Sequence, residues 1–349
     1  MRSVASRVPV VILSGHLGSG KTTLLNHLLR QPGARVGVIV NDFGEVNIDA
    51  GLVSGQIDDP ASIAGGCLCC LPDAGGLDDA LAKLTGRGLD VVIIEASGIA
   101  EPGTLAQLIR VSRVDRVRPG GVIEVVDAVE YFRTLDTMPT AEPPARFDAA
   151  TLVVINKGDL LPADGREQAI TRIEQRVRER NERVPIIRAV RSRIDPALVY
   201  DVAATEDPAD QLPIGALLRA AHEEHQDRPG HGHAAHQHAA SVTVARTEPT
   251  DPDRLATLLE EPPATAYRIK GVVAVATPRG PRRYLLNVVG RTVDLVAASP
   301  TTGPASELVA IGLDLDTDDV RARLEAALAP AQQPTVAASR RLHRYLATG

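Results

Sequence analysis

Tryptophan is absent from this chain of 349 residues, and aromatic residues make up only 2% of it. Because 44% of the residues are nonetheless hydrophobic, the cores must be built mainly from Val, Leu, Ile and Ala. The formal net charge is −6, and no basic stripe with interleaved aromatic residues occurs. We therefore expect no nucleic-acid partner.

Long apolar runs are also missing. None approaches the roughly 18–20 residues that a membrane-spanning helix needs, so we expect no membrane partner. The first apolar run, residues 8–13, is shorter than the core of a signal peptide and leads directly into a glycine-rich loop. Reduced thiols and the lack of an export signal predict a cytoplasmic protein.

Lysine is scarce as well, with only Lys21, Lys83, Lys157 and Lys270 among 38 basic residues. An ammonium is a compact point charge, whereas a guanidinium is a planar fork, and the two are not interchangeable. Lys21 and Lys157 both lie in loops that follow apolar runs. We therefore expect these two ammonium groups to have specific tasks.

Cysteine occurs only at Cys67, Cys69 and Cys70, directly after two glycines. Three thiols in one loop indicate a soft-metal site, because thiolates select zinc, copper(I) and similar ions. Cys67 and Cys69 are two residues apart and would point the same way in an extended stretch, so both could bind one ion. We expect these two to be ligands and Cys70 to be a third ligand or a transfer partner.

The first half of the chain alternates apolar runs with helical patterns, which predicts an α/β fold with a mostly parallel sheet covered by helices. The runs are apolar throughout, as is typical of strands buried on both faces. The expected strands are residues 9–14, 36–41, 91–95, 121–126, 152–156 and 184–190. The expected helices are residues 21–30, 76–84, 104–110 and 164–180.

The composition changes after residue 205. We expect a nucleotide-binding domain over 1–205, a helix and a His-rich linker over 206–240, a small α+β domain over 241–330 and a tail over 331–349. In the third segment we expect strands at 241–246, 267–276, 283–296 and 307–313, with helices at 252–259 and 317–329. The linker histidines indicate an auxiliary metal-binding tract or a polar tether without function; they are His231, His233, His236 and His238.

Residues 15–22 read G-x-x-x-x-G-K-T between an expected strand and an expected helix, the context that a phosphate-binding loop needs. Its main-chain N–H groups would face phosphate oxygens, Lys21 would reach the β- and γ-phosphates, and the hydroxyl of Thr22 would ligate Mg²⁺. The expected nucleotide contacts here are Gly15, Gly18, Ser19, Gly20, Lys21, Thr22 and Thr23.

Residues 156–159 read N-K-x-D at the end of an apolar strand, which resembles the guanine-recognition motif of GTPases. Asp159 could accept two hydrogen bonds from guanine, while adenine has no such pair of donors. Asn156 would brace neighbouring loops, and Lys157 would lie along the base. The pattern favours GTP over ATP.

Carboxylates follow two other expected strands. Glu95 begins an E-x-x-G pattern and would face Mg²⁺, while the N–H of Gly98 would sense a γ-phosphate. The segment 41–49 carries three more acids and reads as a switch segment or a solvated loop. We expect Asp42 or Asp49 near Mg²⁺, and Glu45 near the metal held by the cysteines.

Together, GHLGSGKTT at 15–23, NDFGEVNID at 41–49, GGCLCC at 65–70, EASGIAEP at 95–102 and NKGD at 156–159 resemble the CobW-type GTPases. Residues 267–271 and 306–312 are similar to the C-terminal domain of that family. The resemblance implies a metallochaperone that uses GTP, Mg²⁺ and Zn²⁺ or Co²⁺ and delivers the metal to client proteins. It leaves the metal, the client and the oligomeric state open.

Three alternatives remain from the sequence. One is a GTPase regulator or assembly factor that holds zinc structurally. Another is a nickel-delivery GTPase, which the histidine tract fits and the cysteine loop does not. The last is a nucleotide-dependent kinase, which the N-K-x-D motif and the thiol cluster disfavour.

Overall fold

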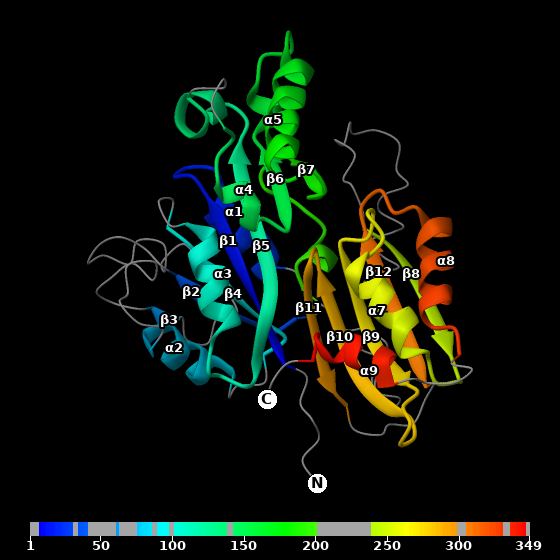
Figure 1. The fold of residues 1–349 in the computed structure, drawn as a ribbon. Coiled ribbons are helices and arrows are strands. Elements are labelled where there is room, and N and C mark those ends of the chain that lie inside the picture. Colours follow the sequence, from blue (N-terminus) through cyan, green and yellow to red (C-terminus); the bar gives the residue numbers. More distant parts are fainter. Residues whose placement is uncertain are drawn as a thin grey trace, which may run out of the picture.

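The computed structural model describes residues 7–30, 34–40, 61–62, 75–85, 89–97, 101–137, 142–200, 239–298, 305–330 and 336–346. These residues form a parallel sheet with helices and, beside it, an antiparallel sheet with helices of its own (Figure 1). The expected fold class is confirmed. None of the described helices combines the length and the apolar character needed to cross a membrane.

The parallel sheet has seven strands in the order β3-β2-β4-β1-β5-β6-β7. Every neighbouring pair is parallel, so the carboxyl ends of all strands lie at the same edge. The strands are β1 (Val8–Gly15), β2 (Val36–Val40), β3 (Ala61–Ser62), β4 (Val91–Glu95), β5 (Val117–Asp127), β6 (Leu152–Asn156) and β7 (Ile186–Ala189).

Both faces of this sheet are covered, which explains why its strands are apolar throughout. Successive residues of β1 point to opposite faces, with Val11 and Leu13 in one buried cluster with residues of α1, and Val10 and Ile12 in another with residues of α2 and α3. The helices are α1 (Lys21–Leu29), α2 (Gly75–Thr85), α3 (Pro102–Arg110), α4 (Arg146–Ala149) and α5 (Arg166–Arg180). Short helical turns are η2 (Tyr131–Leu135), η3 (Gly158–Leu160) and η4 (Pro196–Leu198).

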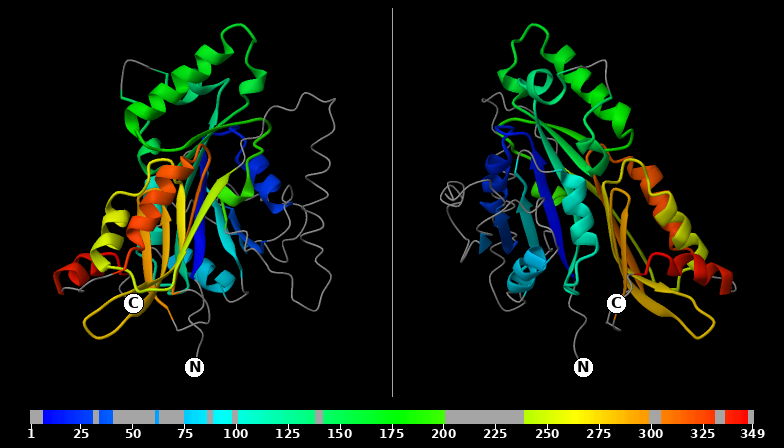
Figure 2. Two further views of the ribbon diagram at one scale, coloured as in Figure 1. Left: turned by 90° about the vertical axis from the view of Figure 1, so that its right-hand side faces the viewer. Right: turned by 60° about the vertical axis from the view of Figure 1, so that its left-hand side comes forward.

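The antiparallel sheet has the order β11-β10-β9-β12-β8 and is covered on one face by its own helices (Figure 2). Its strands are β8 (Ala240–Arg246), β9 (Arg268–Val275), β10 (Arg282–Val289), β11 (Thr292–Ala297) and β12 (Ser306–Gly312). Its helices are α7 (Pro252–Glu260), α8 (Thr317–Ala327) and α9 (Val336–His343).

The two sheets share apolar contacts. Tyr267, Val289 and Ile311, from the antiparallel part, belong to the same buried cluster as Val11 and Leu24. At the rim of this contact, the guanidinium of Arg7 pairs with the buried carboxylate of Asp294 at 2.7 Å. The arrangement of the two sheets is therefore held by packing as well as by chain connectivity.

One expectation about the second half is wrong. The expected single strand at 283–296 is two strands, β10 and β11, because Gly290 (φ +56°) and Arg291 form a tight turn between Val289 and Thr292. No element was assigned to 331–349, and its described part contains a helix, α9, that packs on α7. Its Arg341 pairs with Asp253 and Glu260 of α7, so the basic run of the tail is anchored by acids of this chain.

Candidate functional site

The phosphate loop connects the end of β1 to the start of α1, and two of its glycines are required by the strands beside it. A Cβ at Gly15 (φ +151°) would lie 2.4 Å from the main-chain oxygen of Val125. A Cβ at Gly20 (φ +108°) would lie 2.4 Å from Nδ2 of Asn156. A larger residue at either position would collide with β5 or β6 and would also be strained at this φ.

The first turn of α1 is arranged to receive an anion. No side chain caps the helix at Gly20, so its first N–H groups face the loop. Nζ of the buried Lys21 donates to the main-chain oxygens of Gly15 at 2.9 Å and His16 at 3.2 Å. The ammonium is therefore held inside the loop, where a phosphate group would replace carbonyl oxygens as its partner.

Thr22 and Glu95 come together at the carboxyl ends of β1 and β4. The hydroxyl of Thr22 donates a hydrogen bond of 2.7 Å to Oε1 of Glu95. Hydroxyl and carboxylate oxygens are the ligands that Mg²⁺ prefers, so this pair fits the ion chemically. The sequence had assigned these two residues to the metal side of the nucleotide, and the structure brings them into contact.

Asn156 joins the end of β6 to the phosphate loop. Its Nδ2 donates to the main-chain oxygen of Ser19 at 2.9 Å and to the hydroxyl of Ser192 at 2.8 Å. Its Oδ1 accepts from the main-chain N–H of Ser192 at 2.9 Å, and the Ser192 hydroxyl donates to the main-chain oxygen of Gly20 at 3.1 Å. The asparagine thus braces two neighbouring loops.

Lys157, in the left-handed conformation at φ +64°, makes a second link between the N-K-x-D motif and the phosphate loop. Its Nζ lies 2.6 Å from the main-chain oxygen of Gly18 and 2.6 Å from Oδ2 of Asp127. The other oxygen of Asp127 accepts main-chain hydrogen bonds from Val129 and Glu130, which fixes the carboxylate. The phosphate loop and the N-K-x-D motif therefore form one site.

The other residues predicted to contact the nucleotide differ in how exposed they are. Asp159 is exposed on η3, where its carboxylate is open to a ligand. Ser19 is buried beneath the loop, whereas Thr23 is exposed on α1. Gly18 (φ +79°) has nothing within 4 Å of a Cβ position, so its conformation alone favours glycine.

Sequence analysis missed Asp127 and Ser192. Neither lies within a fixed-spacing motif, and each follows or ends a strand next to β6. The signal that could have found them is topological, because the carboxyl ends of adjacent parallel strands meet at one edge. The expected strand at 121–126 stopped one residue short of Asp127.

A buried ion pair lies behind the phosphate loop. Oε1 of Glu124 is 3.2 Å from Nη1 of Arg146, and Glu124 is the register partner of Ser14 in β1. Burial raises the pKa of the Glu124 carboxyl, and Arg146 opposes this shift. Partial burial lowers the pKa of His16, and the charges of Arg146 and Lys21 lower it further.

Several predicted residues lie outside the described ranges. They are Asp42, Glu45 and Asp49 of the segment 41–49, Gly98 of the E-x-x-G pattern, the loop cysteines Cys67, Cys69 and Cys70, and the linker histidines His231, His233, His236 and His238. Within the part of the chain that the structure describes, no group of three or more His, Cys, Asp and Glu side chains is arranged to hold a metal ion. The described residues thus include the predicted nucleotide site, while the predicted metal ligands lie outside them.

Two family models match this chain. Residues 9–188 match the CobW/HypB/UreG nucleotide-binding domain, and residues 239–328 match the Cobalamin synthesis protein cobW C-terminal domain. The first match spans the strands of the phosphate loop and of the N-K-x-D motif.

Individual relatives also match along most of the chain. Zinc chaperone CobW of Pseudomonas aeruginosa is 30% identical over 384 residues, which cover 94% of this chain and 93% of that protein. Zinc chaperone YjiA of Escherichia coli is 27% identical over 330 residues, which cover 90% of this chain and 97% of that protein. The crystal structure of the Zn(II)-bound YjiA GTPase from E. coli covers 94% of this chain and 99% of that chain, with 23% identity and a TM-score of 0.41.

Proposed function

Because the chain belongs to the CobW/HypB/UreG family, by a match over residues 9–188, we propose that it is a GTPase that delivers a divalent transition metal to client proteins. In this proposal GTP binds at the phosphate loop and at Asp159, and zinc or cobalt binds at Cys67 and Cys69. Cys70 is a third ligand or a transfer partner, and Glu45 lies near the ion. The relatives from P. aeruginosa and E. coli are named zinc chaperones, which supports zinc first.

One observation carries the nucleotide half of the proposal. Asn156 and Lys157 bond directly to the main chain of the phosphate loop, at Ser19 and Gly18. A ligand that spans both motifs would therefore meet donors for its phosphates and an acceptor for its base within one rigid frame. The exposed Asp159 carboxylate can accept the paired N–H donors of guanine, which supports GTP over ATP.

Each described residue of the site would have its own role in hydrolysis. Lys21 would donate to the β- and γ-phosphates in place of the carbonyl oxygens that it now contacts. Thr22 and Glu95 would hold Mg²⁺, and Asp42 or Asp49 would add to them. When bound, Mg²⁺ neutralises charge on the phosphates as the terminal group leaves. Hydrolysis should be slow, since no arginine finger can be assigned from the motifs.

Metal delivery would follow the nucleotide state. GTP would order the segments around Cys67 and Glu45 together, the thiolates would then bind the ion tightly, and hydrolysis would release it to a bound client. Thiolate ligands need reducing conditions, so we place this cycle in the cytoplasm. The histidines at 231–238 would serve as a loose auxiliary site.

A metal titration against a chromophoric zinc chelator tests the proposal. The protein is measured with GDP and with a non-hydrolysable GTP analogue, with Mg²⁺ present, and cobalt and nickel are then compared with zinc. We expect the two nucleotide states to differ in zinc affinity by about tenfold or more, and zinc to tighten binding of the analogue by the same factor.

Two variants make the result specific. Cys67→Ser should remove the nucleotide-dependent zinc binding and leave nucleotide affinity in the absence of zinc unchanged. Lys21→Ala should remove nucleotide binding and leave a zinc affinity that nucleotides no longer alter. Equal zinc affinity in both nucleotide states would contradict delivery, and zinc that resists the chelator in both states would assign it a structural role.

A further inference from the structure

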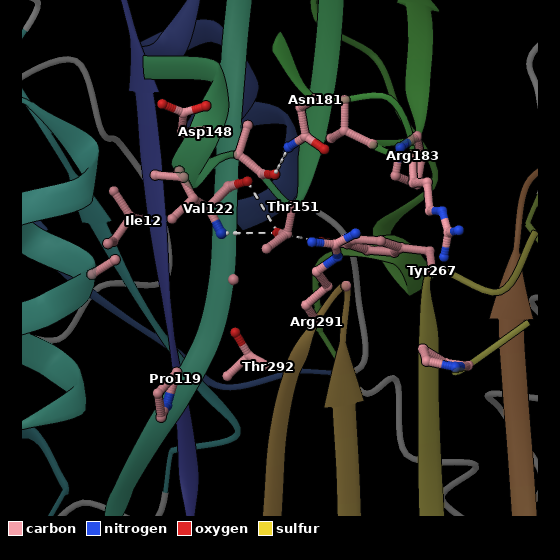
Figure 3. A pocket seen from close by; sticks show the side chains of 18 of the residues that line it. Ile12, Pro119, Val122, Asp148, Thr151, Asn181, Arg183, Tyr267, Arg291 and Thr292 are labelled. Carbon is pink, nitrogen blue, oxygen red and sulfur yellow. Dashed lines mark hydrogen bonds between the residues drawn. The ribbon is translucent and has the colours of Figure 1, made fainter. Parts of the chain in front are cut away.

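A cleft of about 790 Å³ lies between the two sheets. Figure 3 shows Thr151, Asn181 and Arg183 facing it from the parallel-sheet side, and Tyr267 and Arg291 facing it from the antiparallel side. The volume lies within the range of about 300–1,000 Å³ typical of ligand-binding pockets. Both halves of the chain are therefore needed to form it.

The cleft is separate from the nucleotide site. Several of the residues that line it from the parallel sheet lie near the amino ends of strands, such as Pro119 in β5, Thr151 before β6 and Pro185 before β7. The phosphate loop and the N-K-x-D motif follow the carboxyl ends of β1 and β6. Since the strands are parallel, the two sites lie at opposite edges of the sheet.

The side chains that line the cleft carry more positive than negative charge. Its two acids are already paired, Asp148 with Arg180 and Glu260 with Arg341. Among the described residues, three further arginines at the rim have no ion-pair partner and are exposed: Arg110 at the end of α3, Arg183 before β7, and Arg291 in the β10–β11 turn.

The lining of the cleft combines apolar and polar surface in similar amounts. Val122, Pro185 and Pro263 contribute apolar surface. Thr151 bonds to the main chain of Val122, and its hydroxyl lies 3.4 Å from that of Tyr267. Burial raises the pKa of the Tyr267 hydroxyl, so it stays protonated and can donate a hydrogen bond at neutral pH.

We propose that this cleft binds a short peptide segment of a partner protein in which acidic side chains alternate with apolar ones. Apolar side chains would fill the space lined by the prolines, and carboxylates would meet Arg110, Arg183 and Arg291. A guanidinium can bind a carboxylate through two parallel hydrogen bonds, which suits this pairing. The proposal concerns a site apart from the nucleotide and does not depend on the metal or on its delivery.

The origin of the arginines in three separate elements leads us to propose a peptide rather than a small anion. They come from three separate elements, and each is exposed at the rim. A small anion such as phosphate would require donors that converge on one point inside the cleft. Carboxylates that are carried on an extended chain can reach separate points of the rim.

Fluorescence anisotropy with a labelled octapeptide of alternating Glu and Leu tests the proposal on the full chain. We expect saturable binding that weakens as the salt concentration is raised, because exposed charges are screened. The matched peptide with Gln in place of every Glu should bind about tenfold or more weakly, since it cannot pair with the arginines.

Three variants locate the binding. The double variant Arg183→Glu, Arg291→Glu should weaken binding of the acidic peptide by about tenfold or more, because it places like charges at the rim. Gly103→Leu, on α3 where a Cβ would meet only the methyl group of Ala149 at 3.8 Å, should block the cleft by its volume. The control Arg279→Glu, in the β9–β10 turn outside the cleft, should bind like the parent chain. Unchanged GTP-analogue affinity and circular dichroism would show that each variant is folded.

Several results would overturn the proposal. They are no binding of the acidic peptide, equal binding of both peptides, or an unchanged affinity in the double variant. Displacement of the peptide by inorganic phosphate at matched concentration would assign the cleft to a small anion. A parent oligomer in sedimentation experiments that dissociates in both cleft variants would assign it to a second copy of the chain.

Discussion

The hydroxyl of Thr22 lies 2.7 Å from Oε1 of Glu95 and donates a hydrogen bond to it. The two residues are 73 positions apart in sequence, and each adjoins the carboxyl end of a strand, β1 and β4, that pair side by side. Parallel pairing therefore places a hydroxyl and a carboxylate, both suited to Mg²⁺, at one point beside the phosphate loop.

Replacing the carboxylate of Glu95 should slow GTP hydrolysis. Glu95→Gln keeps the shape and the hydrogen bond to Thr22 but removes the charge, so we expect GTP turnover to fall by about 10- to 100-fold and the Mg²⁺ requirement to rise. Steady-state phosphate release over a Mg²⁺ titration measures both. Asp90→Asn, at the opposite end of β4, is the control and should hydrolyse GTP normally. Equal turnover of both variants would exclude Glu95 from the metal site.

Removing the side chain of Asn156 should lower both stability and nucleotide affinity. Asn156→Ala leaves the buried N–H of Ser192 without its acceptor, so we expect a loss of about 2–3 kcal/mol in the free energy of unfolding. Urea unfolding and binding of a fluorescent GTP analogue measure the two effects. Asn181→Ala also removes two side-chain hydrogen bonds, to Phe147 and Ala150, but far from the loop. Asn181→Ala should lower stability without changing nucleotide affinity. If Asn181→Ala lost nucleotide affinity as well, the loss in Asn156→Ala would not show that Asn156 braces the phosphate loop.

The buried Glu124 should make stability depend on pH. Burial raises its pKa in the folded chain above the ordinary value of 4.5. The folded state then holds the proton more tightly than the unfolded state does, so the stability from Glu124 is present below pH 4.5 and is lost as pH rises through the folded pKa. Glu124→Gln cannot ionise.

The comparison of Glu124→Gln with the parent chain isolates this effect. We expect the difference in their free energies of unfolding to move in favour of the variant as pH rises above 4.5. Urea unfolding at a series of pH values gives both curves. A constant difference across the series would show that the proton affinity of Glu124 is the same in both states.

Two Arg–Asp pairs of different burial should differ in their contribution to stability. Arg7→Ala leaves the buried carboxylate of Asp294 without its cation, so we expect it to cost about 1–3 kcal/mol. Arg35→Ala breaks an exposed pair with Asp90 and should cost less than about 1 kcal/mol. Thermal and urea unfolding measure both changes. Equal losses would mean that burial of Asp294 does not set the strength of its pair.

The sequence was sufficient for those parts of the site that carry a fixed spacing. Gly15, Lys21 and Thr22 were predicted together because one loop holds them, and Asn156 was predicted to brace loops, as it does. Asp127 and Ser192 could not be predicted in the same way. They reach the site only because β5, β6 and β7 are neighbours in the sheet, which is a property of topology and leaves no pattern along the chain.

The two features of the second half that were not predicted have different physical origins. Apolar residues stand on both sides of Gly290 and Arg291, so residues 283–296 resemble one long strand, and the chain turns at Gly290, which has φ +56°. The helix α9 is short, and it is anchored by Arg341 to acids of α7 that are about 80–90 positions away in sequence. Local propensity could not reveal this anchor.

The buried cluster that joins Tyr267, Val289 and Ile311 to Val11 and Leu24 has a consequence for how the chain can be divided. A fragment that ended before β8 would keep the phosphate loop and the N-K-x-D motif but would expose part of that cluster to water. Such a fragment should aggregate unless polar side chains replaced the uncovered apolar ones. We therefore expect the nucleotide-binding part to depend on its C-terminal neighbour as a cover, which should be retained when the protein is shortened, fused or redesigned.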